Sequence, residues 1–411
     1  MQANEIIKNA ENKIQKTLRN IEQTAEYNQE KVLEAFRTCK IDAQHFFTVS
    51  GYGHDDIGRE AIDNVFATAF RAEKAIARNH FVSGTHTLSC CLFGNLRSGE
   101  KLVSVVGAPY DTMEEVIGKR GDKRASLIGH GVLYDEVGLK VENGEEIVDF
   151  DAISKKVDKT VNMILIQRSR GYSLRRSVSV DEIAEIVRIV KKNNPDCICF
   201  VDNCYGEFVE EKEPLEVGAD LIGGSLIKNP GGGIVEAGGY IAGKEKYVDY
   251  AAQSLTAPGI GSKGGAMLNQ SRLILQGFFM APSIVAEALK GAVLAAQVFE
   301  DIGFYSTPKP QAKRTDIIQS IKFGKPEPLI DFCKVLQSYS PIESYLTPVP
   351  DEVVGYDDKL IMAGGSFIEG STIELSADGP LREPYVAYMQ GGLNYAHVKI
   401  ALRHIVEELA K

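Results

Sequence analysis

The chain carries one aspartate and one lysine whose types and spacing suit chemistry on a bound cofactor. Asp202 ends the apolar run 197–201, and Lys228 follows the next apolar run on a loop that continues into three glycines. A lysine amine condenses with an aldehyde only when unprotonated, and a water-poor pocket favours that form by lowering the lysine pKa. A carboxylate keeps a pyridine nitrogen protonated, so that the ring draws electrons from the substrate. The pair therefore predicts a pyridoxal phosphate site, although either residue alone is also typical of a solvated or capping position.

Three further segments offer groups for the phosphate and ring of such a cofactor. The segment Ser83–Thr85 opens a predicted helix, where free backbone N–H groups and the positive end of the helix dipole attract a phosphate. An ordinary Ser/Thr helix cap gives the same pattern, so both interpretations stay open. Ser225, three residues before Lys228, adds a hydroxyl group. Tyr110 follows the strand predicted at 101–106 and could lay its ring on the pyridine; a surface turn tyrosine is the alternative.

Other cofactor and metal sites find less support in the sequence. The run Gly94–Gly99 resembles a phosphate-binding loop, but Glu100 stands where that motif requires lysine. The glycine-rich run 231–239 is not placed in a strand-to-helix dinucleotide-binding unit. The seven cysteines and seven histidines show no spacing typical of zinc ligands, so no metal site is predicted.

Composition excludes several classes of partner. A chain of 411 residues with 44% hydrophobic content predicts two or three domains. The net charge of −10, without a sustained basic stripe, argues against nucleic acid as the main partner. The polar N-terminus does not resemble a signal peptide, and the apolar run 286–299 is too short and too charged to span a membrane. An odd cysteine count in a long chain favours reduced thiols, so we expect a cytoplasmic protein.

From about residue 60, apolar strands alternate with helices, which predicts a mainly parallel sheet covered on both faces. Ser179 and Glu182 form a capping box for a helix that reaches Val190. Residues 3–47 are expected to form two charged amphipathic helices, and residues 264–302 are rich in helix. Beyond a break at 307–310, short strands are predicted at 359–366, 371–376 and 384–390, followed by a helix at 394–409. The expected units are an N-terminal helical segment that contacts a neighbouring subunit, a large cofactor-binding α/β domain and a small α+β domain: 1–58, 59–305 and 306–411.

At this point the residues carry a family resemblance. The chain resembles the fold-type-I pyridoxal phosphate enzymes of the Cys/Met-metabolism superfamily, and more closely the aluminium-resistance, or methionine γ-lyase-like, proteins. The resemblance spans roughly residues 5–405 and rests on five segments: Phe81–His86, Leu92–Gly99, Gln167–Ser173, Val201–Phe208 and Ala377–Arg382. It implies an α/β fold of the pyridoxal phosphate transferase type, with a mainly parallel seven-stranded sheet flanked by helices and a small α+β C-terminal domain.

The resemblance also implies roles at single positions. Lys228 would be the Schiff-base lysine and Asp202 the partner of the pyridine nitrogen. Tyr110 would stack on the ring, and the phosphate would be held by Ser83, Gly84, Thr85 and Ser225.

Two more positions concern a shared site and the substrate. Tyr52 matches a tyrosine that relatives send to the phosphate of a neighbouring subunit, which implies a homo-oligomer, at least a dimer and by expectation a tetramer. Relatives have arginine two residues later, where this chain has His54, so that task is left to Arg59 or Arg168. Arg382 would grip the substrate carboxylate with its bidentate fork, although a surface arginine in a Gly-Pro turn is an equal alternative.

The expected activity is a pyridoxal phosphate-dependent carbon–sulfur lyase acting on sulfur amino acids, of the cystathionine β-lyase or methionine γ-lyase type, with a possible link to aluminium resistance. Lys228 would act as general base on the Cα proton and then as general acid toward the thiol. An aminotransferase or another pyridoxal phosphate enzyme is the first alternative, because the fold is shared among these activities. A non-catalytic metal-tolerance factor on the same fold is the second.

Overall fold

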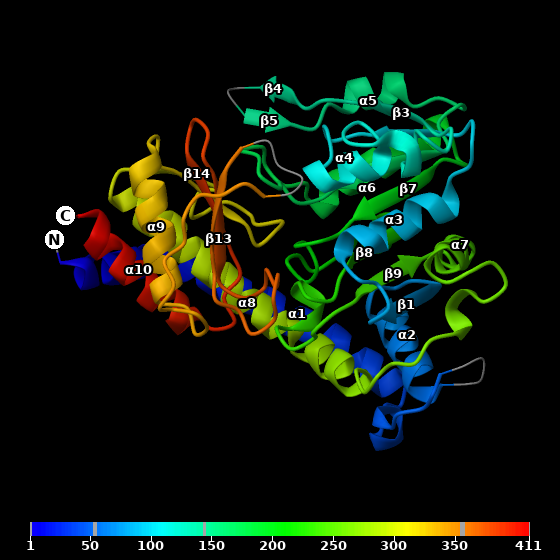
Figure 1. Ribbon diagram of the computed structural model, residues 1–411, viewed down its shortest axis with the longest axis horizontal. Coiled ribbons are helices and arrows are strands. Elements are labelled where there is room, and N and C mark those ends of the chain that lie inside the picture. The colour runs from blue at the N-terminus through cyan, green and yellow to red at the C-terminus, as the bar shows by residue number, and fades with distance from the viewer. Residues whose placement is uncertain (1, 52–55, 143–144, 354–357, 411) are drawn as a thin grey trace.

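The computed structural model describes residues 2–51, 56–142, 145–353 and 358–410 (Figure 1). Its central feature is a seven-stranded sheet in which β9 is antiparallel to both neighbours and the remaining pairs are parallel. The strand order is β1 (Lys74–Arg78), β9 (Gly239–Gly243), β8 (Leu221–Ser225), β7 (Ile198–Asp202), β6 (Met163–Gln167), β2 (Lys101–Ser104) and β3 (Leu133–Glu136). The prediction of a mainly parallel, seven-stranded sheet is therefore confirmed.

Helices cover both faces of this sheet, which explains why its inner strands are apolar at every position. Along β6, Met163 and Leu165 face one layer, whereas Ile164 and Ile166 face the other. The first layer contains α3 (Gly84–Asn95), α4 (Asp111–Ile117) and α7 (Glu245–Leu255). The second contains α2 (Ile57–Ala69), α5 (Phe150–Lys156), α6 (Val180–Asn193) and α8 (Ser271–Asp301). The capping box of Ser179 and Glu182 begins α6 as predicted.

The N-terminal region corrects the expectation of two helices, because α1 is one continuous helix from Ala3 to Thr38. No glycine or proline interrupts that range, and its buried stripe, which includes Ile7, Ile14, Ile21 and Val32, packs along α8 (Figure 1). The helix α8 is itself long and apolar enough to cross a membrane by length and composition, contrary to our expectation for this region. However, 67% of its most apolar window is buried inside the protein, as in the core helix of a folded domain.

A second, fully antiparallel sheet follows α8 in the chain. Its strand order is β10 (Tyr305–Thr307), β11 (Gln319–Lys322), β14 (Val386–Gln390), β13 (Ser376–Pro380) and β12 (Leu360–Ala363), and α9 (Pro326–Ser338) and α10 (Tyr395–Leu409) pack nearby. The predicted strand at 371–376 is wrong, because the ladder begins only at Ser376. The Glu374 carboxylate accepts the Phe367 and Ile368 N–H groups, so its apolar neighbours are buried in a loop instead of a strand. The domain limits at residues 58 and 305 stay a prediction.

The remaining elements are short. A two-stranded ribbon joins β4 (Lys140–Glu142) to β5 (Glu145–Ile147). Single turns of 3₁₀ helix lie at Ala43–Phe46, Lys123–Ala125, Pro214–Val217, Asn229–Gly231 and Gly261–Lys263.

Candidate functional site

A cavity of about 620 Å³ opens where the parallel strands end. In the sheet register, Gln167 of β6 lies beside Asp202 of β7, which lies beside Gly223 of β8. Chain segments that follow β2, β6, β7 and β8 line the cavity together with the start of α3 and with residues of the second sheet. The carboxyl ends of parallel strands are where open α/β sheets bind ligands, because the loops diverge there. Sequence-predicted residues that line the cavity are Gly84, Thr85, Tyr110, Asp202, Ser225, Lys228 and Arg382.

Asp202 and Lys228 meet on this cavity from adjacent strands. Asp202 is buried, and its Oδ1 accepts the Cys204 N–H at 3.1 Å, which fixes the orientation of the carboxylate. Burial raises the pKa of Asp202, and the opposing charge of Lys228 lowers it again in part. A buried carboxylate of this kind requires a cationic partner, which Lys228 supplies within the chain.

The Lys228 ammonium corrects the expectation of a lowered lysine pKa. Burial alone does lower the pKa, since it removes water from the charged form. Acidic groups around the lysine outweigh burial and raise the pKa well above its ordinary value: Cys204, Tyr205, Asp202 and Tyr110. Burial alone therefore does not describe this site, because the four acidic groups also surround the lysine.

The start of α3 lies directly against Ser225. A Cβ built on Gly84 would come within 3.1 Å of the Ser225 Cβ, so glycine permits this close approach. The Ser225 hydroxyl is buried and has no hydrogen-bond partner among the described residues. A helix N-terminus beside a free hydroxyl fits a phosphate group. Ser83, in contrast, accepts the His86 N–H as the cap of α3 and is exposed outside the cavity lining, so the structure shows it in the capping role.

Tyr110 is fixed at both ends. Its backbone N–H donates to Gln167 Oε1 at 2.8 Å, and its hydroxyl lies 3.0 Å from the Thr85 hydroxyl. Burial raises the pKa of Tyr110, with a further contribution from Asp202, so the phenol stays neutral. These contacts hold the tyrosine beside the N-terminus of α3, where a ring-shaped ligand would lie against it.

The outer edge of the cavity carries exposed charges. Arg382 is 56% exposed in its side chain, and its Nη1 pairs with Asp358 Oδ2 at 2.9 Å. Arg120 pairs with Asp111 at 3.3 Å on the same rim. Arg382 therefore reaches the cavity from the second sheet, but it already has an acidic partner.

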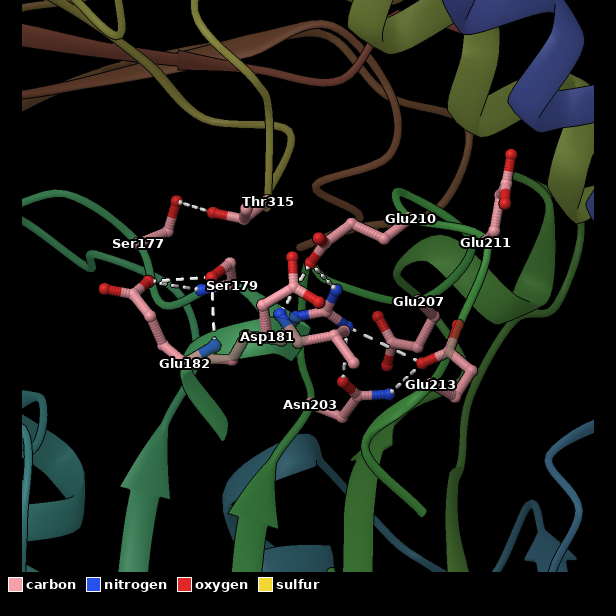
Figure 2. A network of polar contacts seen from close by, with 12 residues as sticks. Ser177, Ser179, Asp181, Glu182, Asn203, Glu207, Glu210, Glu211, Glu213 and Thr315 are labelled. Carbon is pink, nitrogen blue, oxygen red and sulfur yellow. Dashed lines mark hydrogen bonds and ion pairs between the residues drawn. The ribbon is translucent and has the colours of Figure 1, made fainter. Parts of the chain in front are cut away.

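The alternatives for a second phosphate ligand lie elsewhere. Tyr52 and His54 fall outside the described residues. Arg59 is buried and donates to the backbone carbonyls of residues 51, 263 and 265. Arg168 is buried in ion pairs with Glu210 and Glu213, and Figure 2 labels these two carboxylates. Among the described residues, neither arginine belongs to the cavity lining.

Sequence reasoning missed several residues of the cavity wall. Tyr205 places its ring centroid 4.1 Å from Lys228 Nζ. Arg170 and Arg175 are buried in the lining; Arg175 donates to the carbonyls of residues 167 and 169. Only one feature could have found Tyr205, which is its place three residues after Asp202 in a segment already quoted for the resemblance. Arg170 also lies in a segment quoted for the resemblance, although its contact with Thr307 comes from a distant part of the chain, whereas Arg175 lies outside the quoted segments.

Known proteins resemble this chain over nearly its whole length. A family model described as methionine gamma-lyase matches residues 3–410. The uncharacterized protein YnbB of Bacillus subtilis is 48% identical over 390 residues, which cover 95% of this chain and 92% of YnbB. Among solved structures, a carbon-sulfur lyase involved in aluminum resistance from Clostridium novyi NT has a TM-score of 0.94 at 46% identity, covering 99% of this chain and 96% of that one.

Two further structures extend the comparison. A candidate cystathionine beta-lyase involved in aluminum resistance from Clostridium acetobutylicum has a TM-score of 0.96 at 47% identity, with 100% and 96% coverage. The pyridoxal-5′-phosphate dependent protein YhfS from Escherichia coli has a TM-score of 0.62 at 14% identity, with 94% and 97% coverage. At this sequence identity, the similarity to YhfS concerns the fold alone.

Proposed function

The chain belongs to the methionine gamma-lyase family, and we propose that it is a pyridoxal phosphate-dependent carbon–sulfur lyase that cleaves thioether amino acids. The observation that carries this proposal is the convergence of Lys228, Asp202 and Ser225 on one cavity at the strand ends. Family members with solved structures include a carbon-sulfur lyase involved in aluminum resistance, which supports the reaction class.

The residues present fit the cofactor. Lys228 would hold it covalently, and Asp202 would pair with its ring nitrogen. The free Ser225 hydroxyl and the start of α3 at Gly84 and Thr85 would take the phosphate. When bound, the cofactor supplies an electron-withdrawing ring that stabilises negative charge at the substrate Cα.

Asp202 supplies electrostatic stabilisation in this scheme. Its Oδ1 is fixed by the Cys204 N–H, so the carboxylate needs no reorientation when positive charge is placed opposite it. Burial of Asp202 strengthens that interaction, because little water competes with it. Tyr110 is held by Thr85 and Gln167, and it gives the ring a flat, fixed wall.

Lys228 moves the protons. With the cofactor bound, Lys228 Nζ would accept the Cα proton of the substrate and later donate a proton to the departing sulfur, which leaves as a thiol. The acidic groups that raise the Lys228 pKa favour the protonated amine, which is the form that donates a proton. Pairing of Asp202 with a ring nitrogen weakens that bias, so the neutral amine becomes available for the first transfer.

The rim favours a substrate with a charged tail. The pairs Arg382–Asp358 and Arg120–Asp111 place both signs of charge where the far end of a thioether would lie. Methionine ends in an uncharged methyl group, whereas cystathionine ends in a second amino-acid head. The rim therefore supports cystathionine-type cleavage, with Arg382 exchanging Asp358 for a substrate carboxylate.

The remaining parts of the proposal concern the assembly. We propose a cytoplasmic homo-oligomer, at least a dimer, in which Tyr52 of one subunit completes the site of another. A tetramer is the expected form. Measurement of molar mass in solution by light scattering tests this, and a monomer with full activity would contradict it.

The activity is tested with purified protein loaded with pyridoxal phosphate. Cystathionine and methionine are supplied separately, and thiol, ammonia and keto acid are measured. The proposal expects all three products, with cystathionine preferred. Amino-group transfer that leaves an aminated cofactor without thiol release would instead indicate an aminotransferase.

A further inference from the structure

The contact between Tyr205 and Lys228 is unusual in its backbone as well as its geometry. The Tyr205 ring centroid lies 4.1 Å from Lys228 Nζ, and both residues line the cavity. Tyr205 has a φ of +69°, a left-handed conformation that tyrosine rarely adopts. Such strain persists only where the surroundings fix it, and it is concentrated at functional sites.

A buried polar network fixes the turn that carries Tyr205 (Figure 2). Asn203, two residues before the tyrosine, accepts from Arg168 Nη1 at 2.8 Å and donates to Glu213 Oε2 at 3.0 Å. Arg168 also pairs with Glu210 at 2.9 Å. The Asn203 N–H donates to the carbonyl of Gly223 in the neighbouring strand, so the turn is tied to the sheet.

Gly206, the residue after Tyr205, lets Arg168 pack closely against this turn. A Cβ on Gly206 would lie 2.5 Å from both Cδ and Nη1 of Arg168, so the guanidinium packs directly on this turn. Arg168, Asn203 and Glu213 are fully buried, and water cannot take over their hydrogen bonds. The backbone on both sides of Tyr205 is therefore held by one network.

We propose that Tyr205 is a catalytic residue that stabilises the free ammonium of Lys228 through its ring, and that Arg168 and Asn203 are positioning residues that keep the ring there. This rests on the proposed function only in giving Lys228 its catalytic role. A cation over an aromatic face is attracted by the ring quadrupole, and the attraction is strongest where water is excluded. The ring would hold the lysine in its proton-donating form each time the substrate displaces it.

Other groups face Lys228 and must be separated from the ring effect. Asp202 and Cys204 face it from β7 and the turn, Tyr110 faces it from the start of α4, and Glu207 acts from farther along the turn. These groups act through their ionisable atoms. Tyr205 contributes in both ways, through its phenol and through its ring, so replacement by phenylalanine keeps the ring contribution alone and replacement by leucine removes both.

The test measures the Lys228 pKa directly in the cofactor-free full chain. Competitive acetylation with isotopically labelled anhydride across pH, followed by mass mapping of the Lys228 peptide, gives the pKa without substrate or turnover. Tyr205→Phe removes the phenol but keeps the ring, so it should lower the Lys228 pKa less than Tyr205→Leu does. Tyr205→Leu should lower it by about one unit, and Asn203→Ala should lower it by less. Tyr172→Leu, which changes another tyrosine of the same cavity, should leave it unchanged.

Fluorinated phenylalanines at position 205 guard against a leucine variant that fails to fold. They keep the ring shape and weaken its quadrupole stepwise, so the Lys228 pKa should fall stepwise. Equal pKa values for the wild type, the fluorinated series and Tyr205→Leu would overturn the role of Tyr205. A wild-type pKa in Asn203→Ala would overturn the positioning role. Because no C–S cleavage is measured, failure here is distinct from failure of the lyase proposal.

Discussion

The floor and the rim of the cavity hold their charges in different ways. The floor comprises Lys228, Asp202 and Tyr205 with the Arg168 network beneath them, and the side chains of Arg168 and Glu213 are 0% exposed. The rim comprises Arg382, Asp358, Arg120 and Asp111, and Arg382 is 56% exposed. Charges that are screened by water interact weakly and rearrange easily, whereas buried ones interact strongly and need every partner. The difference suggests that the floor sets the chemistry and the rim selects the substrate.

The largest expected effect follows from breaking the network beneath the floor. Arg168→Met leaves the buried Glu213 without its cation and leaves Glu210 with Lys313 alone, which should destabilise the protein by about 3–5 kcal/mol. Chemical denaturation measures this loss. Arg188→Met, which removes an exposed pair with Glu185 on α6, is the matched control and should change stability by less than about 1 kcal/mol. Equal effects of the two variants would contradict the contrast between buried and exposed pairs.

Removing charge from the floor itself should affect the chemical step. Asp202→Asn keeps the shape of the side chain and should lower kcat by about 10²–10³-fold, with little change in KM. Arg382→Met on the rim should instead raise KM with kcat nearly unchanged. Steady-state kinetics on cystathionine separates the two. A rise in KM alone for Asp202→Asn would show that the floor only binds.

The turn that carries Tyr205 should also make stability depend on pH, through the buried carboxyl of Glu207. Burial raises the pKa of this carboxyl from 4.5 to about 8, and its Oε1 accepts the Tyr240 hydroxyl at 2.8 Å. The folded state therefore favours the protonated form, so the stabilisation is full below pH 4.5 and is lost as pH rises toward 8. Between these limits the contribution should fall by about 1.4 kcal/mol per pH unit.

Denaturation at a series of pH values tests this, because Glu207→Gln should remove that slope. Glu115→Gln changes an exposed carboxyl of α4 and serves as the control, since it should leave the slope in place. A wild-type slope in Glu207→Gln would show that the carboxyl does not carry the proton.

The smallest expected effect on stability belongs to the rim. Asp358→Asn removes an exposed partner of Arg382 and should change the free energy of unfolding by less than about 1 kcal/mol. Its effect should be on selectivity, since a freed Arg382 binds the second carboxylate at the far end of cystathionine, which methionine lacks, more readily. The ratio of kcat/KM for cystathionine to that for methionine should rise. An unchanged ratio would mean that the rim does not contact the substrate tail.

The same contrast explains what the sequence could predict. Asp202, Ser225 and Lys228 follow apolar strands, and the alternation of strands with helices brings adjacent strand ends together. Local pattern therefore sufficed for a mainly parallel sheet and for most of the cavity floor, whereas the count of seven strands was implied by the family resemblance. It did not suffice for residues 371–376, because the Glu374 carboxylate accepts the N–H groups of Phe367 and Ile368 and holds this segment in a loop before β13 begins.

Properties that depend on residues far apart in the chain could not be predicted from local sequence patterns. Tyr205 reaches Lys228 only because its backbone is left-handed, and Arg168, far from it in sequence, holds that turn through Asn203. The pKa of Lys228 was expected to be low from burial alone, whereas acidic groups from two chain segments, 202–205 and Tyr110, raise it. The apolar stripe of α1 likewise finds its partners far away in the chain, mainly on α8 and also on α2 and α10.

The central claim is that Lys228 anchors pyridoxal phosphate in this cavity. The most direct test incubates the purified protein with the cofactor, reduces it with borohydride and maps the modified peptide by mass spectrometry. The account predicts one pyridoxyl adduct, on Lys228, that is lost in Lys228→Ala. No adduct in the presence of excess cofactor, or an adduct on another lysine, would contradict it.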